Sequence, residues 1–233
     1  MSNDKLRKAK EKAAEAALEH IFTGQIIGLG SGSTVAIFVE KLGEKVGREQ
    51  MKIRVIPSSY QALFLAYEYG LPVLQPSDVE NVDVTIDGAD EIDKNLFLLK
   101  GGGAALTREK IIAYKSEKYI VIADYTKLVR YLGEKHPIPI EVLPFGWKWT
   151  LKYLEKYGKP KIRVTNSGKV GPIITDNGNL IIDLYLYESI KDPRRLEREI
   201  KSIPGVVEVG IFTRKANVAY IGYEDIVRRI EPK

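Results

Sequence analysis

The chain has 233 residues, of which 44% are hydrophobic and 29% are charged, a composition typical of globular proteins. Its length allows one large α/β domain or two small ones, and either can bury a hydrophobic core. The absence of cysteine excludes disulfides and thiolate chemistry, and no uninterrupted apolar run is long enough to cross a bilayer. The net charge of +5 comes from lysines and arginines that alternate with acids, so we expect small anionic ligands and no nucleic-acid partner.

The N-terminal segment, residues 1–19, is charged and rich in alanine, and it lacks the apolar core of a signal peptide. We expect a surface helix there and a cytoplasmic protein. The lack of cysteine, the two methionines and the many lysine, glutamate and tyrosine residues favour a thermophilic source.

Strands and helices alternate in the first half of the chain. Apolar runs predict strands at residues 25–30, 52–57, 82–86, 95–99 and 119–123, with helices at 33–46, 60–69 and 107–116. Strands that are apolar throughout and alternate with helices indicate a parallel sheet that is buried on both faces. The predicted fold class is therefore α/β, with a Rossmann-like parallel sheet and helices on both faces.

The pattern changes from about residue 131. Strands are expected at residues 138–143, 161–165, 180–186 and 206–212, with helices at 147–157 and 193–202. This β-α-β-β-α-β order is that of a ferredoxin-like unit, and Asn177-Gly178 predicts a type I′ turn in its central hairpin. A last strand at 217–221 and a short C-terminal helix would return to the first sheet. We therefore predict a Rossmann-like catalytic domain from residues 1–130 and 213–233, and an inserted ferredoxin-like α+β domain at 131–212 that serves assembly.

The first polar cluster is a glycine-rich turn at residues 28–34, between the first strand and its helix. A dinucleotide fingerprint needs a third glycine where Ser33 stands, and the second strand ends in Pro57-Ser58-Ser59, without an acid for a ribose hydroxyl. No lysine follows the glycines as in a P-loop, so NAD and nucleoside triphosphates are both disfavoured. Amides and hydroxyls at a helix N-terminus suit a single phosphate group, with a simple helix cap as the alternative.

The second cluster holds four acids at residues 87–93, directly after a buried strand. Ligands of open α/β sheets bind at the carboxyl ends of the strands. The acids have neither the spacing of an EF-hand nor a nearby histidine, because His20 and His136 are distant and more typical of structural residues. These carboxylates are suited to accept sugar hydroxyls or to relay a proton, and an exposed acidic turn is the alternative.

The third cluster runs from Lys100 through three glycines into a helix that carries Glu109. The strand at 95–99 would deliver Lys100 at its carboxyl end, and the glycines leave backbone amides able to face an anion or a sugar oxygen. In the alternative, Glu109 only offsets the helix dipole and Lys100 is a surface residue. Three polar clusters on the same edge of one sheet favour a catalytic site for a phosphorylated substrate.

Taken together, these motifs resemble those of ribose-5-phosphate isomerases of the A type, over essentially the whole chain. The resemblance rests on Gly30-Ser31-Gly32-Ser33-Thr34 and on residues 87–92, 100–110, 122–127 and 175–179. The phosphate turn of that family often begins with threonine, and Ser31 keeps the hydroxyl here.

The resemblance implies a role for each matching residue. The substrate phosphate would be held by Ser31, Gly32, Ser33 and Thr34. Glu109 would be the proton acceptor, and Lys127 a further substrate-binding lysine. The reacting end of the sugar would be lined by Asp87, Asp90 and Lys100, with Gly88, Ala89, Gly101, Gly102 and Gly103 beside them.

The resemblance further implies an aldose–ketose isomerase of the non-oxidative pentose phosphate pathway, which interconverts D-ribose 5-phosphate and D-ribulose 5-phosphate. No metal or cofactor is implied, and the expected assembly is a homodimer or a homotetramer. An enediol or enediolate intermediate requires a carboxylate base, for which Glu109 is suited, and donors for the developing oxyanion, for which Lys100 and the glycine amides are suited. Either Asp87 or Asp90 would shuttle the hydroxyl proton or help to open the furanose ring.

Two other functions use the same features. A non-catalytic sugar-phosphate sensor would share the phosphate turn, but it would lack the pair Lys100 and Glu109 or carry a DNA-binding module. A metal-dependent sugar isomerase or phosphatase would place residues 87–93 around a divalent ion, and the scarcity of histidine counts against it.

Overall fold

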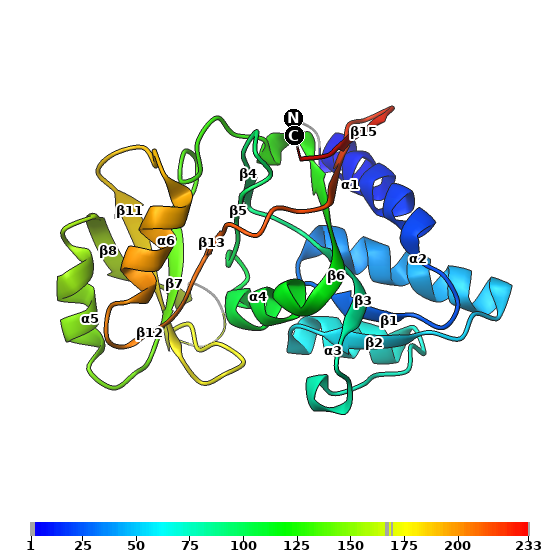
Figure 1. The fold of residues 1–233 in the computed structure, drawn as a ribbon, viewed down its shortest axis with the longest axis horizontal. Coiled ribbons are helices and arrows are strands. Elements are labelled where there is room, and N and C mark those ends of the chain that lie inside the picture. Colours follow the sequence, from blue (N-terminus) through cyan, green and yellow to red (C-terminus); the bar gives the residue numbers. More distant parts are fainter. Residues whose placement is uncertain (1–2, 166–167, 169, 233) are drawn as a thin grey trace. The chain divides into compact units, whose positions relative to one another are not determined.

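The computed structural model describes residues 3–165, 168 and 170–232. Its elements, most of which are labelled in Figure 1, form two compact units. The first unit comprises Met1–Ala89, Arg108–Lys127 and Lys215–Lys233, and the second comprises Asp90–Thr107 and Leu128–Arg214. Residues 90–107 thus lie in the second unit, whereas the sequence analysis assigned them to the first domain.

The first unit is built on a six-stranded sheet with the order β15-β14-β6-β3-β1-β2. Its strands are β1 (Ile26–Leu29), β2 (Arg54–Pro57), β3 (Val82–Asp87), β6 (Ser116–Asp124), β14 (Val218–Gly222) and β15 (Val227–Ile230). All neighbours from β14 to β2 are parallel, and only β15 is antiparallel to its neighbour. This arrangement confirms the predicted Rossmann-like sheet.

Helices cover both faces of this sheet, because alternate side chains of its strands are apolar on each side. Helices α1 (Asn3–Ala17) and α2 (Ser33–Glu49) share one core with Ile27 and Leu29. On the other face, a Cβ atom at Gly28 would lie 2.5 Å from Ile112 of α4 (Leu106–Lys115), so α4 packs closely against β1 there. Helix α3 (Tyr60–Glu68) packs against α2 and β2. No helix in the described part of the chain is long and apolar enough to span a membrane.

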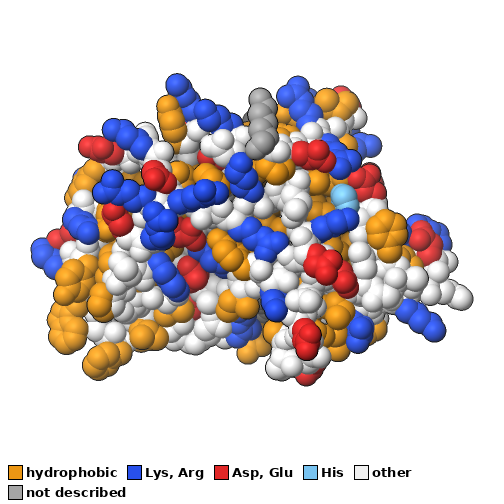
Figure 2. Space-filling view, in the orientation of Figure 1, with side chains coloured by type: hydrophobic (Ala, Val, Ile, Leu, Met, Phe, Trp, Pro, Cys, Tyr) orange, Lys and Arg blue, Asp and Glu red, His pale blue; other side chains and the backbone are white. Residues whose placement is uncertain are grey.

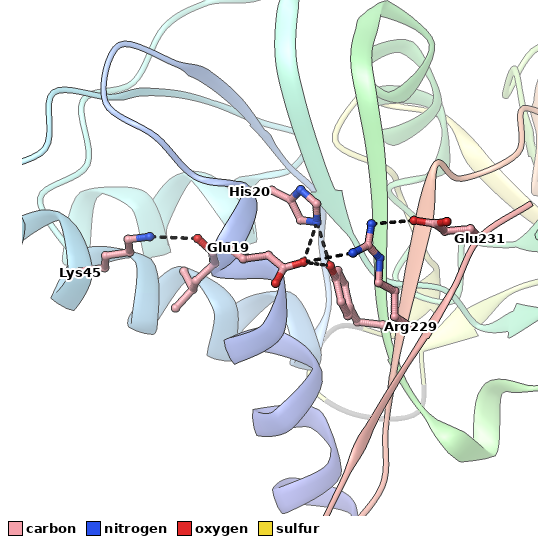
Figure 3. Close-up of polar contacts among 7 residues, drawn as sticks. Glu19, His20, Lys45, Arg229 and Glu231 are labelled. Carbon is pink, nitrogen blue, oxygen red and sulfur yellow. Dashed lines mark hydrogen bonds and ion pairs between the residues drawn. The ribbon is translucent and has the colours of Figure 1, made fainter.

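Short 3₁₀ turns complete the first unit: η1 (Leu18–His20), η2 (Pro76–Asp78) and η3 (Tyr125–Lys127). Turn η1 is fixed to the edge of the sheet by the polar network that Figure 3 draws. His20 Nε2 lies 2.8 Å from the hydroxyl of Tyr220, which donates to the Glu19 carboxylate. Arg229 on β15 lies between Glu19, at 3.9 Å, and Glu231, at 2.6 Å. His20 is thus part of a structural network.

The second unit contains a four-stranded antiparallel sheet with the order β12-β7-β11-β8. Its elements follow the chain as β7 (Ile138–Val142), α5 (Trp147–Leu154), β8 (Gly158–Ile162), β11 (Leu180–Leu186), α6 (Pro193–Lys201) and β12 (Val206–Val209). This connectivity and strand order confirm the predicted ferredoxin-like unit. Two short strands, β9 (Val164–Thr165) and β10 (Gly171–Pro172), pair with each other beside it.

The predicted strand at residues 95–99 is wrong as a member of the parallel sheet. Only β5 (Leu98–Leu99) forms, and it lies in a three-stranded antiparallel sheet between β4 (Glu91–Ile92) and β13 (Ile211–Phe212). The Asp93 carboxylate accepts the backbone N–H groups of Asn95 at 2.8 Å and Phe97 at 2.9 Å, which turns the chain back on itself. Lys100 therefore follows a hairpin strand and not a strand of the parallel sheet.

Three local predictions also need correction. The strand expected at residues 206–212 is divided at Gly210, so β12 and β13 join different sheets. Gly210 lies close to Lys100, because a Cβ atom at Gly210 would be 2.3 Å from the carbonyl oxygen of Lys100. The expected C-terminal helix is strand β15, because a turn after Gly222 pairs it with β14. The type I′ turn is a three-residue loop, in which Gly178 has a positive φ and its N–H donates to the carbonyl of Thr175.

Candidate active site

The candidate site of the first unit lies where the strand order reverses. Strand β1 stands between β2 and β3, so the connections that follow β1 and β3 leave the sheet in opposite directions from neighbouring positions. Such a switch point leaves a crevice at the carboxyl ends of the strands, which is the usual ligand site of open α/β sheets. The turn at residues 30–34 follows β1, and Asp87 is the last residue of β3.

The glycine-rich turn is held in shape by hydroxyl and amide contacts. Gly32, the N-cap of α2, has a φ of 102°, which favours glycine, and its N–H donates to Gln61 at 2.9 Å. The Ser31 hydroxyl donates to Ser59 at 2.7 Å and lies 3.0 Å from the Ser58 hydroxyl. The turn therefore presents a preformed helix N-terminus, as anion-binding sites at helices do.

The sequence analysis did not identify four residues that support this turn, which are Gln61, Ser58, Ser59 and Lys10. Ser58 and Ser59 contact Ser31 from the end of β2. The sequence analysis noted only that no acid stands at this position. Lys10 on α1 donates to the Ser33 hydroxyl at 3.0 Å. No local pattern links α1 to this turn, because 23 residues separate Lys10 from Ser33.

Asp87 is fully buried at the end of β3 and contacts the same turn. One of its carboxylate oxygens accepts the N–H of Gly88 at 2.7 Å and the N–H of Ser31 at 3.4 Å. A Cβ atom at Gly30 would lie 1.8 Å from this oxygen, so Gly30 is needed for the approach of β1 to Asp87. The first and second predicted clusters therefore meet within one unit.

Glu109 lies in the first turn of α4 and is 4% exposed. Helix α4 leads directly into β6, so it runs antiparallel to the strands and its N-terminus points toward their carboxyl ends. Ile112, one turn further along, packs over Gly28 and the neighbouring strand β3. Glu109 is thus placed one turn closer to the edge that carries the glycine-rich turn and Asp87.

Lys127 ends the 3₁₀ turn η3, which follows β6 at the same edge of the sheet. The turn is shaped by Asp124, which is 2% exposed and whose carboxylate accepts the backbone N–H of Thr126 at 2.9 Å. The carboxyl ends of β1, β3 and β6 therefore each carry predicted site residues of the first unit.

The other predicted site residues belong to the second unit, at the ends of the β4–β5 hairpin. The N–H of Asp90 donates to the carbonyl of Leu99 at 2.8 Å, so Asp90 and Lys100 flank the same pair of strands. The Asp90 carboxylate accepts the N–H of Gly102 at 2.7 Å, which joins it to the glycine segment, residues 101–103. Lys100 is 3% exposed, and its ammonium lies 5.7 Å from the ring centre of Phe212.

All four acids of the second cluster accept backbone N–H groups, and Glu91 and Asp93 do so within the second unit. Glu91 is fully buried and accepts the N–H groups of Gly133, Lys135 and His136 at 2.6 to 2.8 Å. Asp93 shapes the turn between β4 and β5. Among the residues that the structure describes, no group of three histidines, cysteines or acids is arranged to hold a metal ion.

The predicted site residues therefore fall into two sets. The first unit carries Ser31, Gly32, Ser33, Thr34, Asp87, Gly88, Ala89, Glu109 and Lys127, and the second carries Asp90, Lys100, Gly101, Gly102 and Gly103. The chain passes from one unit to the other between Ala89 and Asp90 and returns between Thr107 and Arg108. The first unit thus offers an anion site and buried carboxylates, and the second unit offers a buried ammonium group.

Comparison with known proteins gives a consistent result. A family model described as ribose 5-phosphate isomerase A (phosphoriboisomerase A) matches residues 54–226. The ribose-5-phosphate isomerase A of Korarchaeum cryptofilum is 50% identical over 214 residues, which cover 91% of this chain and 92% of the relative. That of Pyrococcus horikoshii is 46% identical over 224 residues, covering 95% and 97%.

Solved structures show the same similarity. Ribose 5-phosphate isomerase A from Methanocaldococcus jannaschii matches with a TM-score of 0.92 and 42% identity, over 97% of this chain and 99% of that one. A D-ribose-5-phosphate isomerase in complex with phospho-erythronic acid matches with a TM-score of 0.94 and 45% identity, over the same shares of the two chains.

Proposed function

Because this chain belongs to the ribose 5-phosphate isomerase A family, we propose that it interconverts D-ribose 5-phosphate and D-ribulose 5-phosphate through an enediolate, with Glu109 as the base. The observation that carries this proposal is the similarity to an enzyme of that name over 95% of the chain. The proposal includes a cytoplasmic place in the non-oxidative pentose phosphate pathway. It also includes a homodimer or homotetramer that is assembled through the second unit.

The glycine-rich turn supplies the phosphate site. The N-terminus of α2 carries a partial positive charge and has no acid in its first turn, so a phosphate meets no repulsion there. The hydroxyls of Ser31, Ser33 and Thr34 add donors, and Lys10 adds a cation beside Ser33. Binding energy from the phosphate then positions the reacting carbons at the other end of the substrate.

Glu109 moves the proton on carbon. It takes the proton from C2 of the open-chain aldose while the electron pair forms the C1–C2 double bond and charge passes to O1. It then returns the proton to C1, while the O2 hydroxyl passes its proton to O1 and C2 becomes the carbonyl. A positioned base contributes about 10²–10⁴-fold to the rate, and the burial of Glu109 keeps water from competing for the proton.

Lys100 and the glycine segment stabilise the oxyanion. The ammonium group of Lys100 is almost fully buried, where a charge interaction is less screened than in water. A well-placed donor to such an oxyanion contributes about 3–4 kcal/mol to transition-state stabilisation. Asp87 and Asp90 carry the hydroxyl proton or assist ring opening, and Lys127 binds the substrate.

The structural relative in complex with phospho-erythronic acid suggests a ligand for this chain. That acid carries a phosphate and a carboxylate at opposite ends of a short carbon chain. The carboxylate resembles the charge that builds up at the reacting end of the substrate, so we expect phospho-erythronic acid to compete with ribose 5-phosphate here.

The first experiment follows the formation of ribulose 5-phosphate from ribose 5-phosphate in excess EDTA. Rapid conversion supports a metal-independent isomerase. Conversion that requires an added divalent ion would indicate that the acids at residues 87–93 bind a catalytic metal ion. Binding without turnover in either condition would favour the sugar-phosphate sensor.

Glu109→Gln tests the base. We expect kcat to fall by about 10²–10⁴-fold because the amide cannot accept the carbon proton, while KM changes little because the phosphate site is intact. Glu117→Gln, at an exposed position of β6, is the matched control and should keep wild-type kcat. A Glu109→Gln variant that keeps most of its activity would show that the base is assigned to the wrong residue.

A further inference from the structure

Arg163, which lies between β8 and β9 in the second unit, is held by an acid on the neighbouring strand. Its Nε and Nη2 atoms donate to the two carboxylate oxygens of Asp183 on β11, at 2.8 and 2.5 Å. Both side chains are largely buried, with 17% and 14% exposed. A bidentate pair of this kind fixes the plane of the guanidinium group.

The remaining nitrogen of the guanidinium group contacts the glycine segment after Lys100. Nη1 of Arg163 donates to the carbonyl oxygens of Gly101 at 2.7 Å and of Gly102 at 3.0 Å. These residues lie about 60 positions earlier in the chain, and all of them belong to the second unit. Two consecutive carbonyl groups thus face one cation.

This contact decides where the amides of the segment point. In a planar trans peptide the C=O and the following N–H point in opposite directions. With the carbonyls of Gly101 and Gly102 turned toward Arg163, the N–H groups of Gly102 and Gly103 are directed away from it. The N–H of Gly102 accordingly reaches the Asp90 carboxylate at 2.7 Å.

Glycine residues need such an external support more than others. Three consecutive glycines have no side chains to limit their backbone angles, and they lose more conformational entropy on ordering than any other residue. Gly101 has a φ of 104°, and a Cβ atom at Gly102 would lie 2.6 Å from the Asp90 carboxylate, so larger residues cannot replace them. A fixed guanidinium group therefore supplies the rigidity that the segment itself lacks.

We propose that Arg163, oriented by Asp183, is a positioning residue that holds the glycine segment so that Asp90 and the Gly103 amide keep their places at the reacting end of the substrate. The inference rests on the proposed isomerase activity. It adds a residue that does not touch the reacting atoms and acts through the peptide groups of residues 101–103. Its removal should therefore affect turnover and spare the binding of the phosphate group.

The test compares Arg163→Met with wild type in the isomerase assay. We expect kcat to fall by about 10- to 100-fold, since a displacement of about 1 Å at a reacting group can cost 100-fold. KM should stay within about threefold, because the phosphate turn, which binds the substrate and the transition state equally, is left unchanged. The inhibition constant of phospho-erythronic acid should rise roughly in step with the fall in kcat, while that of inorganic phosphate stays unchanged.

Arg195→Met is the matched control, because Arg195 forms an ion pair with Glu199 on α6 of the same unit and its side chain is 72% exposed. This variant should keep wild-type kcat. An Arg163→Met variant with kcat within twofold of wild type overturns the inference, and so does an equal loss of affinity for phosphate and for phospho-erythronic acid. If the methionine variant does not fold, Asp183→Asn decides: a fall in kcat at constant KM supports the inference, and wild-type kcat overturns it.

Failure of the proposed function is a separate outcome. It would appear as a wild-type protein without isomerase activity, before any variant is compared.

Discussion

A Cβ atom at Gly30 would lie 1.8 Å from the Asp87 carboxylate, so only glycine fits where β1 ends. Single positions of this kind determine the shape of the candidate site, because each allows a close approach of backbone to a functional group. Gly102 meets the Asp90 carboxylate in the same way, at 2.6 Å from a Cβ atom. The roles of Asp87 and Asp90 are thus tied to glycines on neighbouring segments, and the carboxylates and glycines should be studied as pairs.

His20 leads to a prediction about pH. Burial lowers the pKa of its imidazole from the ordinary 6.5, and Lys118 and Arg229 lower it further, against an opposite effect of Glu19. Between the lowered pKa and 6.5 the unfolded chain binds more protons than the folded one, so stability rises with pH in this window. The stability that the neutral His20 contributes is therefore lost as the pH falls below about 6.5.

The measurement is thermal unfolding at pH 7.5 and pH 5.5 for wild type and His20→Gln. The melting temperature of wild type should fall by a few degrees more than that of the variant, because glutamine does not titrate. An equal difference in His20→Gln and wild type would contradict the prediction.

At the scale of elements, a buried carboxylate joins the hairpin after β10 to the start of α4. Glu141 on β7 is fully buried, and its Oε1 accepts hydrogen bonds from Thr175, Asn177 and Asn179 at 2.8 to 3.0 Å. Its Oε2 accepts the hydroxyl of Thr107 at 2.5 Å. Residues 175–179, which the sequence analysis noted as a hairpin turn and through the family resemblance, are therefore part of the support for the start of α4.

Replacing this carboxylate should destabilise the fold. Glu141→Ala leaves a cavity and four donors without their acceptor, and an unsatisfied buried group costs about 1–3 kcal/mol, so we expect a loss of about 3–5 kcal/mol in the free energy of unfolding. Glu141→Gln keeps the volume and one carbonyl acceptor and should lose less. Urea denaturation followed by circular dichroism measures both, and equal stabilities of Glu141→Ala and wild type would refute the assigned role.

At the scale of the molecule, the second unit displays an aromatic surface. On α5, Trp149 is 70% exposed and Tyr153 is 58% exposed, and a spacing of four residues places them on one face of the helix. Phe145, just before the helix, is 85% exposed. Figure 2 shows hydrophobic side chains gathered at the lower left, over the region where Figure 1 places α5. Exposed apolar patches of this kind mark protein–protein contacts.

We therefore expect assembly through this surface. The double substitution Trp149→Glu and Tyr153→Glu should convert the proposed homodimer or homotetramer to a smaller species, because charges would be buried at the contact. Light scattering after size-exclusion chromatography gives the masses. Phe22→Glu, at a position that follows η1 and is 60% exposed in the first unit, is the matched control and should leave the mass unchanged. A monomeric wild type would contradict the assembly itself.

The sequence by itself determined the class of fold, most helix and strand positions and the candidate residues of the site. Apolar runs and helical periods depend on neighbours a few residues apart, so β1, β3, β11 and α6 could be predicted closely. The glycine-rich turn could also be predicted, because the backbone angles of such a turn depend on the residues within it.

The tertiary structure alone decided which strands pair and which side chains support the site. Residues 95–99 and 206–212 read as continuous apolar strands, yet β5 pairs with the distant β13, and the close approach of Lys100 divides the second segment at Gly210. Lys10 beside Ser33 and Arg163 on the glycine carbonyls have no local signal either. The physical reason is that the contacts of Lys10 and Arg163 join residues 23 and 62 positions apart, and their energy depends on how the whole chain folds rather than on any local pattern.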